Sequence, residues 1–109
     1  MSKRALPPIT HLQFLVLEAL SDSEQAGRDL RSLLATHRVR RTLPAFYQMM
    51  ARLEDAGLVD GWYDQQVVDG QLLKERRYAL TRPGRRALEQ TRAFYAHYVT
   101  GRRTRTSDA

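Results

Sequence analysis

The chain has 109 residues, 42% of them hydrophobic, no cysteine, and a formal net charge of +6 at pH 7. This composition favours a single domain with one modest core and excludes a wholly disordered chain, disulfides, thiolate metal sites and cysteine nucleophiles. The excess of lysine and arginine, 18 against 12 carboxylates, favours a polyanionic partner, nucleic acid before an anionic membrane surface, over a merely basic soluble protein.

We expect no targeting signal in the N-terminal part of the sequence. Residues 1–8 carry charge but are not followed by the apolar run of a signal peptide, and we expect them to form a flexible arm. The segment from Ile9 to Leu20 is too short to span a membrane and is interrupted by polar residues. We therefore expect a cytoplasmic protein with no membrane partner.

A first helix is predicted to run from Thr10 to about Leu20. Thr10 is a helix-capping residue, and Gln13 follows at the spacing of a reciprocal capping box. Apolar residues cover more than one face of this helix, because Phe14 and Leu17 widen its stripe. We expect the helix to be buried on two sides, either deep in the core of the subunit or against a second subunit.

Two further helices are predicted before the periodicity changes. Residues 21–23 are expected to cap a helix over about residues 24–36, in which Gly27 marks a close helix crossing. Thr42 is expected to cap the third helix, and Gly57 to end it. The apolar stripe of the third helix is predicted to contain Phe46, Met49 or Met50, Leu53 and Ala56.

A β-hairpin is predicted after the third helix. Residues 58–68 are rich in β-branched and aromatic side chains, and Asp69-Gly70 is a strong signal for a two-residue turn into a strand over residues 72–80. The expected cross-strand partners are Val68 with Gln71, Val67 with Leu72, and Trp62 with Arg77.

The chain is predicted to end in a long helix over about residues 82–99, which Thr81 caps. The order of elements therefore predicts a mainly α fold with a small β-hairpin, a winged helix-turn-helix with an added C-terminal helix. The expected parts are a DNA-binding domain over residues 9–81, a dimerisation helix over residues 82–100, and flexible ends at residues 1–8 and 101–109.

Charge is distributed unevenly over these elements. From Arg38 to Arg52 there are four arginines and no carboxylate, and from Arg76 to Arg105 there are nine basic residues against Glu89 alone. In winged helix-turn-helix proteins the third helix lies in the DNA major groove, while the hairpin, or wing, touches the backbone or the minor groove. Basic residues therefore gather on the elements that would face DNA.

The outward face of the third helix holds the residues expected to read bases. Gln48 suits adenine, Arg52 suits guanine or a phosphate, and Met49 is expected to lie near the same face. Thr42 and the first backbone amides suit a phosphate, and Tyr47 either bonds a phosphate or packs half-buried. The full set of DNA-contact candidates is Arg40, Arg41, Thr42, Ala45, Tyr47, Gln48, Arg52, Lys74, Arg76 and Arg77.

Two members of that set differ from the others. Arg76 and Arg77 are neighbours on a predicted strand, so their side chains must point to opposite faces of the sheet. The two arginines therefore cannot contribute equally to the side of the wing that faces DNA.

Two strings of the sequence resemble a known family. Residues 45–59, AFYQMMARLEDAGLV, resemble the recognition helix of PadR-like regulators, with its early tyrosine, its Arg-Leu-acidic stretch and its Gly-Leu. Residues 75–88, ERRYALTRPGRRAL, resemble the second wing strand and the following helix start, and residues 15–20, LVLEAL, also fit. The resemblance covers about residues 9–95 and is to the short branch with one C-terminal helix.

Three features depart from the family pattern. Gly27 is followed by Arg28 where a tyrosine is frequent, Leu43-Pro44 stands in place of Pro-Gly, and residues 67–70 hold less glycine than most wings. These departures affect the fine DNA contacts rather than the fold. The resemblance implies a homodimer, in most members a transcriptional repressor, and we expect it to bind a palindromic operator in double-stranded DNA.

The last helix carries more apolar surface than one subunit is expected to cover, which suggests a dimer interface with the first helix. The resemblance also implies that this helix packs across the subunit interface. Some short members of the family bind flat aromatic ligands there, so a small aromatic effector is an alternative to a plain aromatic core. The candidates for this surface are Phe14, Leu17, Leu88, Thr91, Phe94, Tyr95 and Tyr98.

No catalytic site is predicted. The three histidines lack metal-ligand spacing, and Glu54 and Asp55 are adjacent on a helix and face apart. No glycine-rich phosphate loop or nucleophile motif is present, so no enzyme activity, metal or cofactor is expected.

A second function remains open from the sequence. A winged helix can serve protein–protein contact without DNA, in which case the third helix would expose an apolar or acidic face. Arg41, Gln48 and Arg52 argue against that alternative.

Overall fold

The structure, a computed structural model, describes residues 8–107 of the chain. Residues 1–7 and 108–109, which hold most of the expected N-terminal arm and the end of the expected tail, lie outside the described residues. In chain order the elements are α1 (His11–Ala19), β1 (Gln25–Ala26), α2 (Gly27–Thr36), α3 (Leu43–Asp55), β2 (Val59–Val68), β3 (Gln71–Leu80) and α4 (Arg82–Ser107).

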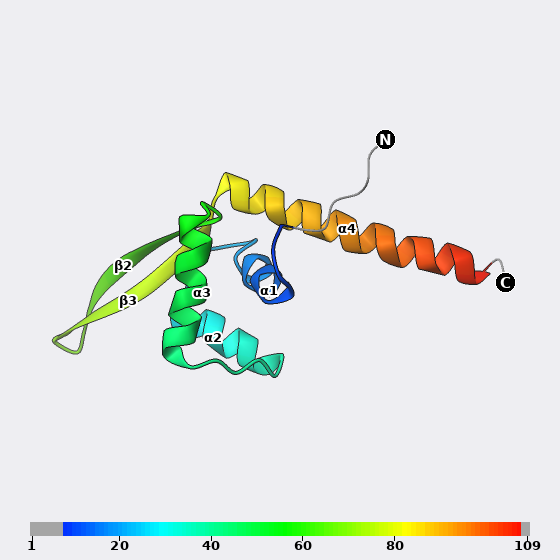
Figure 1. Cartoon of the computed structure of the whole chain (residues 1–109). Helices are drawn as coiled ribbons and strands as arrows, with labels where there is room; N and C mark the ends of the chain where they lie inside the picture. Colours follow the sequence, from blue (N-terminus) through cyan, green and yellow to red (C-terminus); the bar gives the residue numbers. More distant parts are fainter. Residues whose placement is uncertain (1–7, 108–109) are drawn as a thin grey trace.

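The predicted order of three short helices, a hairpin and a long helix is confirmed. Figure 1 shows the β2–β3 hairpin projecting to one side of α3, while α4 passes over α1 and extends in the opposite direction. The short β1 joins the hairpin as a third antiparallel strand, in the order β1-β3-β2. The molecule is consequently long, 66 × 28 × 24 Å, with the hairpin tip and the end of α4 far apart.

The predicted caps of α1, α3 and α4 are confirmed. Thr10 Oγ1 accepts a hydrogen bond from the Gln13 N–H at 3.1 Å, and Gln13 Oε1 accepts one from the Thr10 N–H at 3.0 Å. Thr42 and Thr81 accept bonds from the N–H three residues on, at 3.2 and 3.0 Å. Each bond satisfies a donor that the first turn leaves without a partner, so these residues define where the helices begin.

The predicted start of the second helix is wrong. Residues 21–23 do not cap it, and Gln25–Ala26 form a strand that pairs with Arg77 and Tyr78, so that α2 begins at Gly27 without a side-chain cap. The strand pairing satisfies the backbone of these residues and buries Ala26, which outweighs the helix propensity of one extra turn.

The close approach expected at Gly27 is present, at the start of α2 rather than inside it. A Cβ on Gly27 would lie 3.4 Å from the Tyr78 ring and 3.5 Å from the Tyr47 hydroxyl. The glycine therefore lets the second helix begin directly against the third helix and the sheet.

The hairpin has the predicted turn and register. Asp69 and Gly70 both have positive φ angles, 52° and 77°, as a tight turn between twisted strands requires. The predicted pairs are all present: Val68 with Gln71, Val67 with Leu72, and Trp62 with Arg77.

The inward stripe of α3 follows the prediction with two corrections. Phe46, Met50 and Leu53 are completely buried, as expected. Met49, expected either in the stripe or near the outward face, is also buried. Ala56, expected in the stripe, lies beyond the end of α3 and is exposed.

The last helix begins as predicted but ends later. It runs to Ser107, beyond the end expected near residue 100. Gly84 lies so close to the Leu58 carbonyl oxygen that no other residue would fit there, which seats the first turn of α4 against the start of the hairpin. Leu88 and Thr91 on the following turns are buried in the core of the same subunit.

Candidate nucleic-acid interface

The outer face of α3 is exposed and polar. Gln48, Ala51 and Arg52 are exposed, and the Tyr47 ring is 38% exposed. Among the described residues, no carboxylate lies within ion-pair distance of Arg52. The structure thus brings the predicted base-reading side chains Gln48 and Arg52 together on one accessible surface, with Ala45 half-buried at its edge.

The connector between α2 and α3 adds positive charge beside this face. Arg40 and Arg41 are exposed and, like Arg52, have no ion-pair partner in the described part of the chain. They line a hollow of about 220 Å³ together with Arg31 of α2. Thr42, which caps α3, follows directly and leaves the first amides of the helix near this basic surface.

Sequence reasoning did not single out Arg38 as strained. Its φ is +62°, a left-handed conformation that favours glycine. The Arg38 N–H donates to the Ala35 carbonyl and the Val39 N–H donates to the Leu34 carbonyl, both at 2.9 Å, which is the bonding of a Schellman helix end. An arginine therefore occupies the position where most such helix ends have glycine.

The wing contributes less free positive charge than its sequence suggests. Arg76 binds Glu54 of α3 at 2.7 Å, and Arg77 binds Glu24 at 3.0 Å and Glu75 at 2.9 Å. As expected, the two arginines point to opposite faces of the sheet. Both are engaged within the subunit, so they are poorly placed to contact phosphates.

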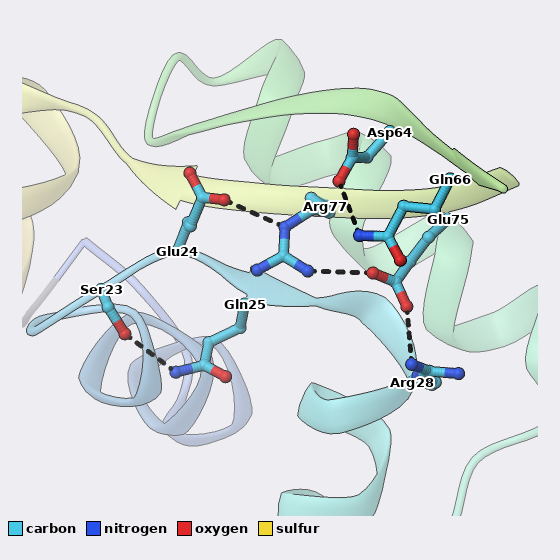
Figure 2. A network of polar contacts seen from close by, with 8 residues as sticks. All are labelled: Ser23, Glu24, Gln25, Arg28, Asp64, Gln66, Glu75 and Arg77. Atoms are coloured by element: carbon cyan, nitrogen blue, oxygen red, sulfur yellow. Dashed lines mark hydrogen bonds and ion pairs between the residues drawn. The ribbon is translucent and has the colours of Figure 1, made fainter. Parts of the chain in front are cut away.

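Figure 2 shows the network on the face of the sheet that Arg77 occupies. Glu75 accepts from Arg77 and from Arg28 of α2, the latter at 2.9 Å, and so ties the hairpin to the second helix. Glu24 holds the same arginine from the segment before β1. The sequence carries no signal for the pairs Arg77–Glu24 and Arg28–Glu75, because their members become neighbours only in the folded chain.

Lys74 is the remaining wing cation among the predicted contacts. It is exposed, and its Nζ lies 5.7 Å from the centre of the Tyr63 ring. A groove of about 460 Å³ runs between the wing and α3, and Lys74, Tyr47 and Ala51 line it. Lys74 thus faces the same groove as Tyr47 and Ala51 of α3.

The tip of the wing is apolar. Val67 and Leu72 are 72% and 62% exposed on one face of the hairpin, and Val68 and Leu73 are 44% and 47% exposed on the other. The sequence pattern of these residues predicts two strands and does not indicate a contact surface. Exposed apolar side chains gathered at a projecting tip indicate a contact surface.

The candidate interface residues on α1 and α4 divide into two groups. Leu17, Leu88 and Thr91 are buried within the subunit itself, so their burial needs no partner. The same face of α4 continues outward as Phe94, Tyr95 and Tyr98.

Exposure increases along that outward face. Tyr95 packs on α1, where its ring stacks on His11 at 5.4 Å and lies 6.1 Å from Phe14. Phe14 and Phe94 are half-buried, and Tyr98 is 53% exposed. In Figure 1 the second half of α4 extends past α1 with no other element beside it.

No group of three or more histidine, cysteine or acidic side chains is arranged to hold a metal ion within residues 8–107. None of the helices described there combines the length and apolar character needed to cross a bilayer.

Solved structures of transcriptional regulators have the same arrangement of elements. A PadR family transcriptional regulator from Eggerthella lenta DSM 2243 is 28% identical, with a TM-score of 0.66 over 83% of this chain and 76% of that one. The chain has a PadR-like winged-helix fold. This PadR-like arrangement also matches a PadR family regulator from Clostridium difficile R20291, 16% identical, with a TM-score of 0.69 over 87% of this chain and 97% of that one.

A third match was solved with nucleic acid. Bacillus subtilis PadR in complex with operator DNA is 22% identical, with a TM-score of 0.60, over 75% of this chain but only 46% of that one. This PadR-like chain therefore spans less than half of the Bacillus protein. No protein-family model and no curated protein sequence matches the chain.

Proposed function

We propose that this PadR-like chain is a sequence-specific, double-stranded DNA-binding transcriptional regulator. The observation that carries the proposal is the outer face of α3, where Gln48 and Arg52 are exposed beside the unpaired arginines Arg40 and Arg41. The likeness to PadR-family regulators, one of them solved with operator DNA, supports it.

In this proposal α3 enters the major groove with its outer face toward the bases. Gln48 can donate one hydrogen bond to adenine and accept one from it, and Arg52 can donate two to guanine. Arg40, Arg41 and the capped start of α3 at Thr42 lie where the helix would cross the phosphate backbone. Phosphate contacts fix the position of the helix, and base contacts decide the sequence.

The wing has a smaller part in DNA contact than its three cations suggest. We propose that Lys74 contacts the backbone, while Arg76 and Arg77, each held by carboxylates, keep the hairpin in place. Tyr47 lies partly exposed at the groove between the wing and α3, with its hydroxyl beside Gly27 at the start of α2.

We further propose that the regulator acts as a homodimer on a palindromic operator. Phe14, Phe94, Tyr95 and Tyr98 form the aromatic surface through which α1 and α4 would meet a second subunit. A two-fold axis would place two copies of α3 about 34 Å apart, the spacing of successive major grooves. Repression, and a small aromatic effector bound in the same surface, rest on the resemblance to short PadR-like regulators.

The test is binding of unmodified protein to fluorescent duplex DNA over a range of salt concentrations. Neutralising about six phosphates per dimer should give a log–log slope near −5, since each contact contributes about −0.9. Arg40→Ala together with Arg41→Ala should make the slope shallower by up to about 4, because a dimer loses up to four phosphate contacts. A salt-independent response, or no binding at low salt, contradicts the proposal.

A second function is favoured by one observation, the apolar wing tip. A winged helix that contacts only another protein would bind it through the exposed tip residues Val67, Val68, Leu72 and Leu73. The outer face of α3 would then contact no DNA. Replacing Val67 and Leu72 with serine separates the two. The DNA-binding reading predicts a small change in DNA affinity, whereas the alternative predicts that duplex DNA is not bound by any form of the protein.

A further inference from the structure

Among the described residues, one ion pair joins the β2–β3 hairpin to α3. The Arg76 Nη2 of β3 lies 2.7 Å from the Glu54 Oε1 of α3, and the two side chains are only 22% and 26% exposed. The guanidinium also lies over two aromatic rings, 4.9 Å from the centre of Tyr63 and 5.5 Å from that of Tyr78. A pair enclosed in this way is less screened by solvent than an exposed ion pair.

The neighbouring strand has a glycine where this pair lies. A Cβ on Gly61 of β2 would be 2.8 Å from both the Arg76 Nη2 and the Glu54 Oε1. Any larger residue would push the two charged groups from their positions. The missing side chain of Gly61 is therefore what admits the pair between the helix and the hairpin.

The pair lies where the orientation of the wing is decided. β2 and β3 are ten-residue strands whose far ends project from the domain, with Val67 at the tip 72% exposed. A change of angle at the base of so long a hairpin becomes a large displacement at its tip. Glu54 lies on α3 and Arg76 lies opposite Tyr63, near the middle of the hairpin, so the contact relates the wing directly to the helix that carries Gln48 and Arg52.

We propose that Glu54 and Arg76 hold the wing at a fixed angle to the recognition helix, so that both elements meet DNA as one rigid unit. The proposal rests on the DNA-binding function proposed above. Arg76 is then a positioning residue, which acts through Glu54 rather than by touching a phosphate. Rigid presentation avoids the cost of ordering the wing when DNA binds.

The ion pairs on the opposite face of the sheet provide a matched comparison. Arg77 binds Glu24 at 3.0 Å, which ties β3 to the segment before β1 and not to α3. Glu24→Gln and Glu54→Gln each remove one carboxylate and one ion pair, so they change the net charge equally. Only the second should release the wing from the recognition helix.

A distance measurement tests the coupling without DNA. The sequence has no cysteine, so two introduced cysteines, Asp55→Cys on α3 and Val67→Cys at the tip, would be the only sites that a spin label modifies. The labelled protein is diluted with unlabelled chain so that only distances within one subunit are measured. The distribution of distances between the two labels should become at least twice as wide in Glu54→Gln and in Gly61→Ala. It should stay unchanged in Glu24→Gln. Equal widths in the unmodified protein and both variants, or equal widening by Glu24→Gln, would overturn the proposal.

DNA affinity then tests the consequence. Glu54→Gln raises the net positive charge, and Gly61→Ala leaves it unchanged. Both variants should nevertheless bind a specific duplex, selected from a random pool by the unmodified protein, at least tenfold more weakly than that protein does. Their affinity for duplexes of random sequence should stay within twofold of its value. Unchanged specific affinity in two folded variants overturns the DNA part of the proposal. If the unmodified protein binds no duplex, the proposed function fails, and the distance measurement still decides whether the pair holds the wing.

Discussion

The carboxylate of Glu18 on α1 is held by the guanidinium of Arg92 on α4 through two hydrogen bonds, each 2.7 Å long. This bidentate contact joins the first helix of the chain to the last, beside the stacked rings of His11 and Tyr95. The hydrogen bond from Arg92 lowers the pKa of Glu18 below its ordinary value of 4.5. The surface proposed for dimerisation is therefore built on two helices that are already fastened together in one subunit.

The first prediction concerns the acid stability of this contact. Because the folded-state pKa of Glu18 is lowered, the pair stabilises the folded chain above about pH 4.5, and this contribution is lost as the pH falls through the folded-state pKa. Glu18→Gln should lower the free energy of unfolding at pH 7 by at most about 1 kcal/mol, since both groups are partly exposed. At a pH below the folded-state pKa of Glu18, the variant and the unmodified protein should be equally stable.

Urea unfolding at the two pH values measures this difference. Asp60→Asn removes an exposed carboxylate for which the structure shows no ion pair, and it is the matched control. If Glu18→Gln lowers stability by the same amount at both pH values, the pair is not the cause.

The second prediction uses the strained connector. Arg38→Gly should raise the free energy of unfolding by about 0.5–1 kcal/mol, because glycine adopts the φ of +62° without the steric penalty of a side chain. Arg38→Ala keeps the strain and should not stabilise the chain. Both variants lose the same charge, so both should bind DNA more weakly if Arg38 adds to the basic surface. Equal stability of the glycine and alanine variants would show that the connector is unstrained.

Sequence patterns predicted the local features and missed those made by distant residues. The caps at Thr10, Thr42 and Thr81 and the register of the hairpin depend on neighbours within a few residues or on one turn, and they are confirmed. β1 has only two residues, too few to show a period of two, and its strand conformation depends on β3. The second helix was therefore predicted to begin too early.

The candidate site shows the same division. The exposure of Gln48 and Arg52 follows from the helical period that buries Phe46 and Leu53, so the sequence sufficed to predict it. The partners of Arg76 and Arg77 did not follow from any period. Glu54 on α3 and Glu24 before β1 are brought to the hairpin only by the folded chain, whereas Glu75 lies two residues from Arg77 on the same strand.

The third prediction concerns assembly. Tyr98→Glu places a charge on the aromatic face of α4 beyond the core of the subunit, and it should convert the proposed dimer to a folded monomer. Ala93→Glu adds the same charge on the opposite side of the helix and should leave the dimer intact. Leu88 is unsuitable for this test because it is buried in the subunit core. Sedimentation at micromolar concentration measures the change, and a monomeric unmodified protein would contradict the proposed assembly.

The fourth prediction separates base reading from phosphate contact. Gln48→Ala should reduce discrimination at one or two base pairs by about 1–3 kcal/mol, whereas Lys74→Ala should weaken binding to all sequences alike. Competition between duplexes that differ at single positions measures both effects. An unchanged sequence preference in Gln48→Ala would mean that the outer face of α3 does not read the bases.

The most direct test of the whole account is selection of bound duplexes from a random pool by the unmodified protein. DNA binding by a dimer through α3 predicts one enriched motif, an inverted repeat whose half-sites lie about one helical turn apart. Arg52→Ala and Gln48→Ala should each relax that motif at defined positions while the protein stays folded. A pool that shows no enriched sequence, with a protein that is folded and dimeric, would contradict the account.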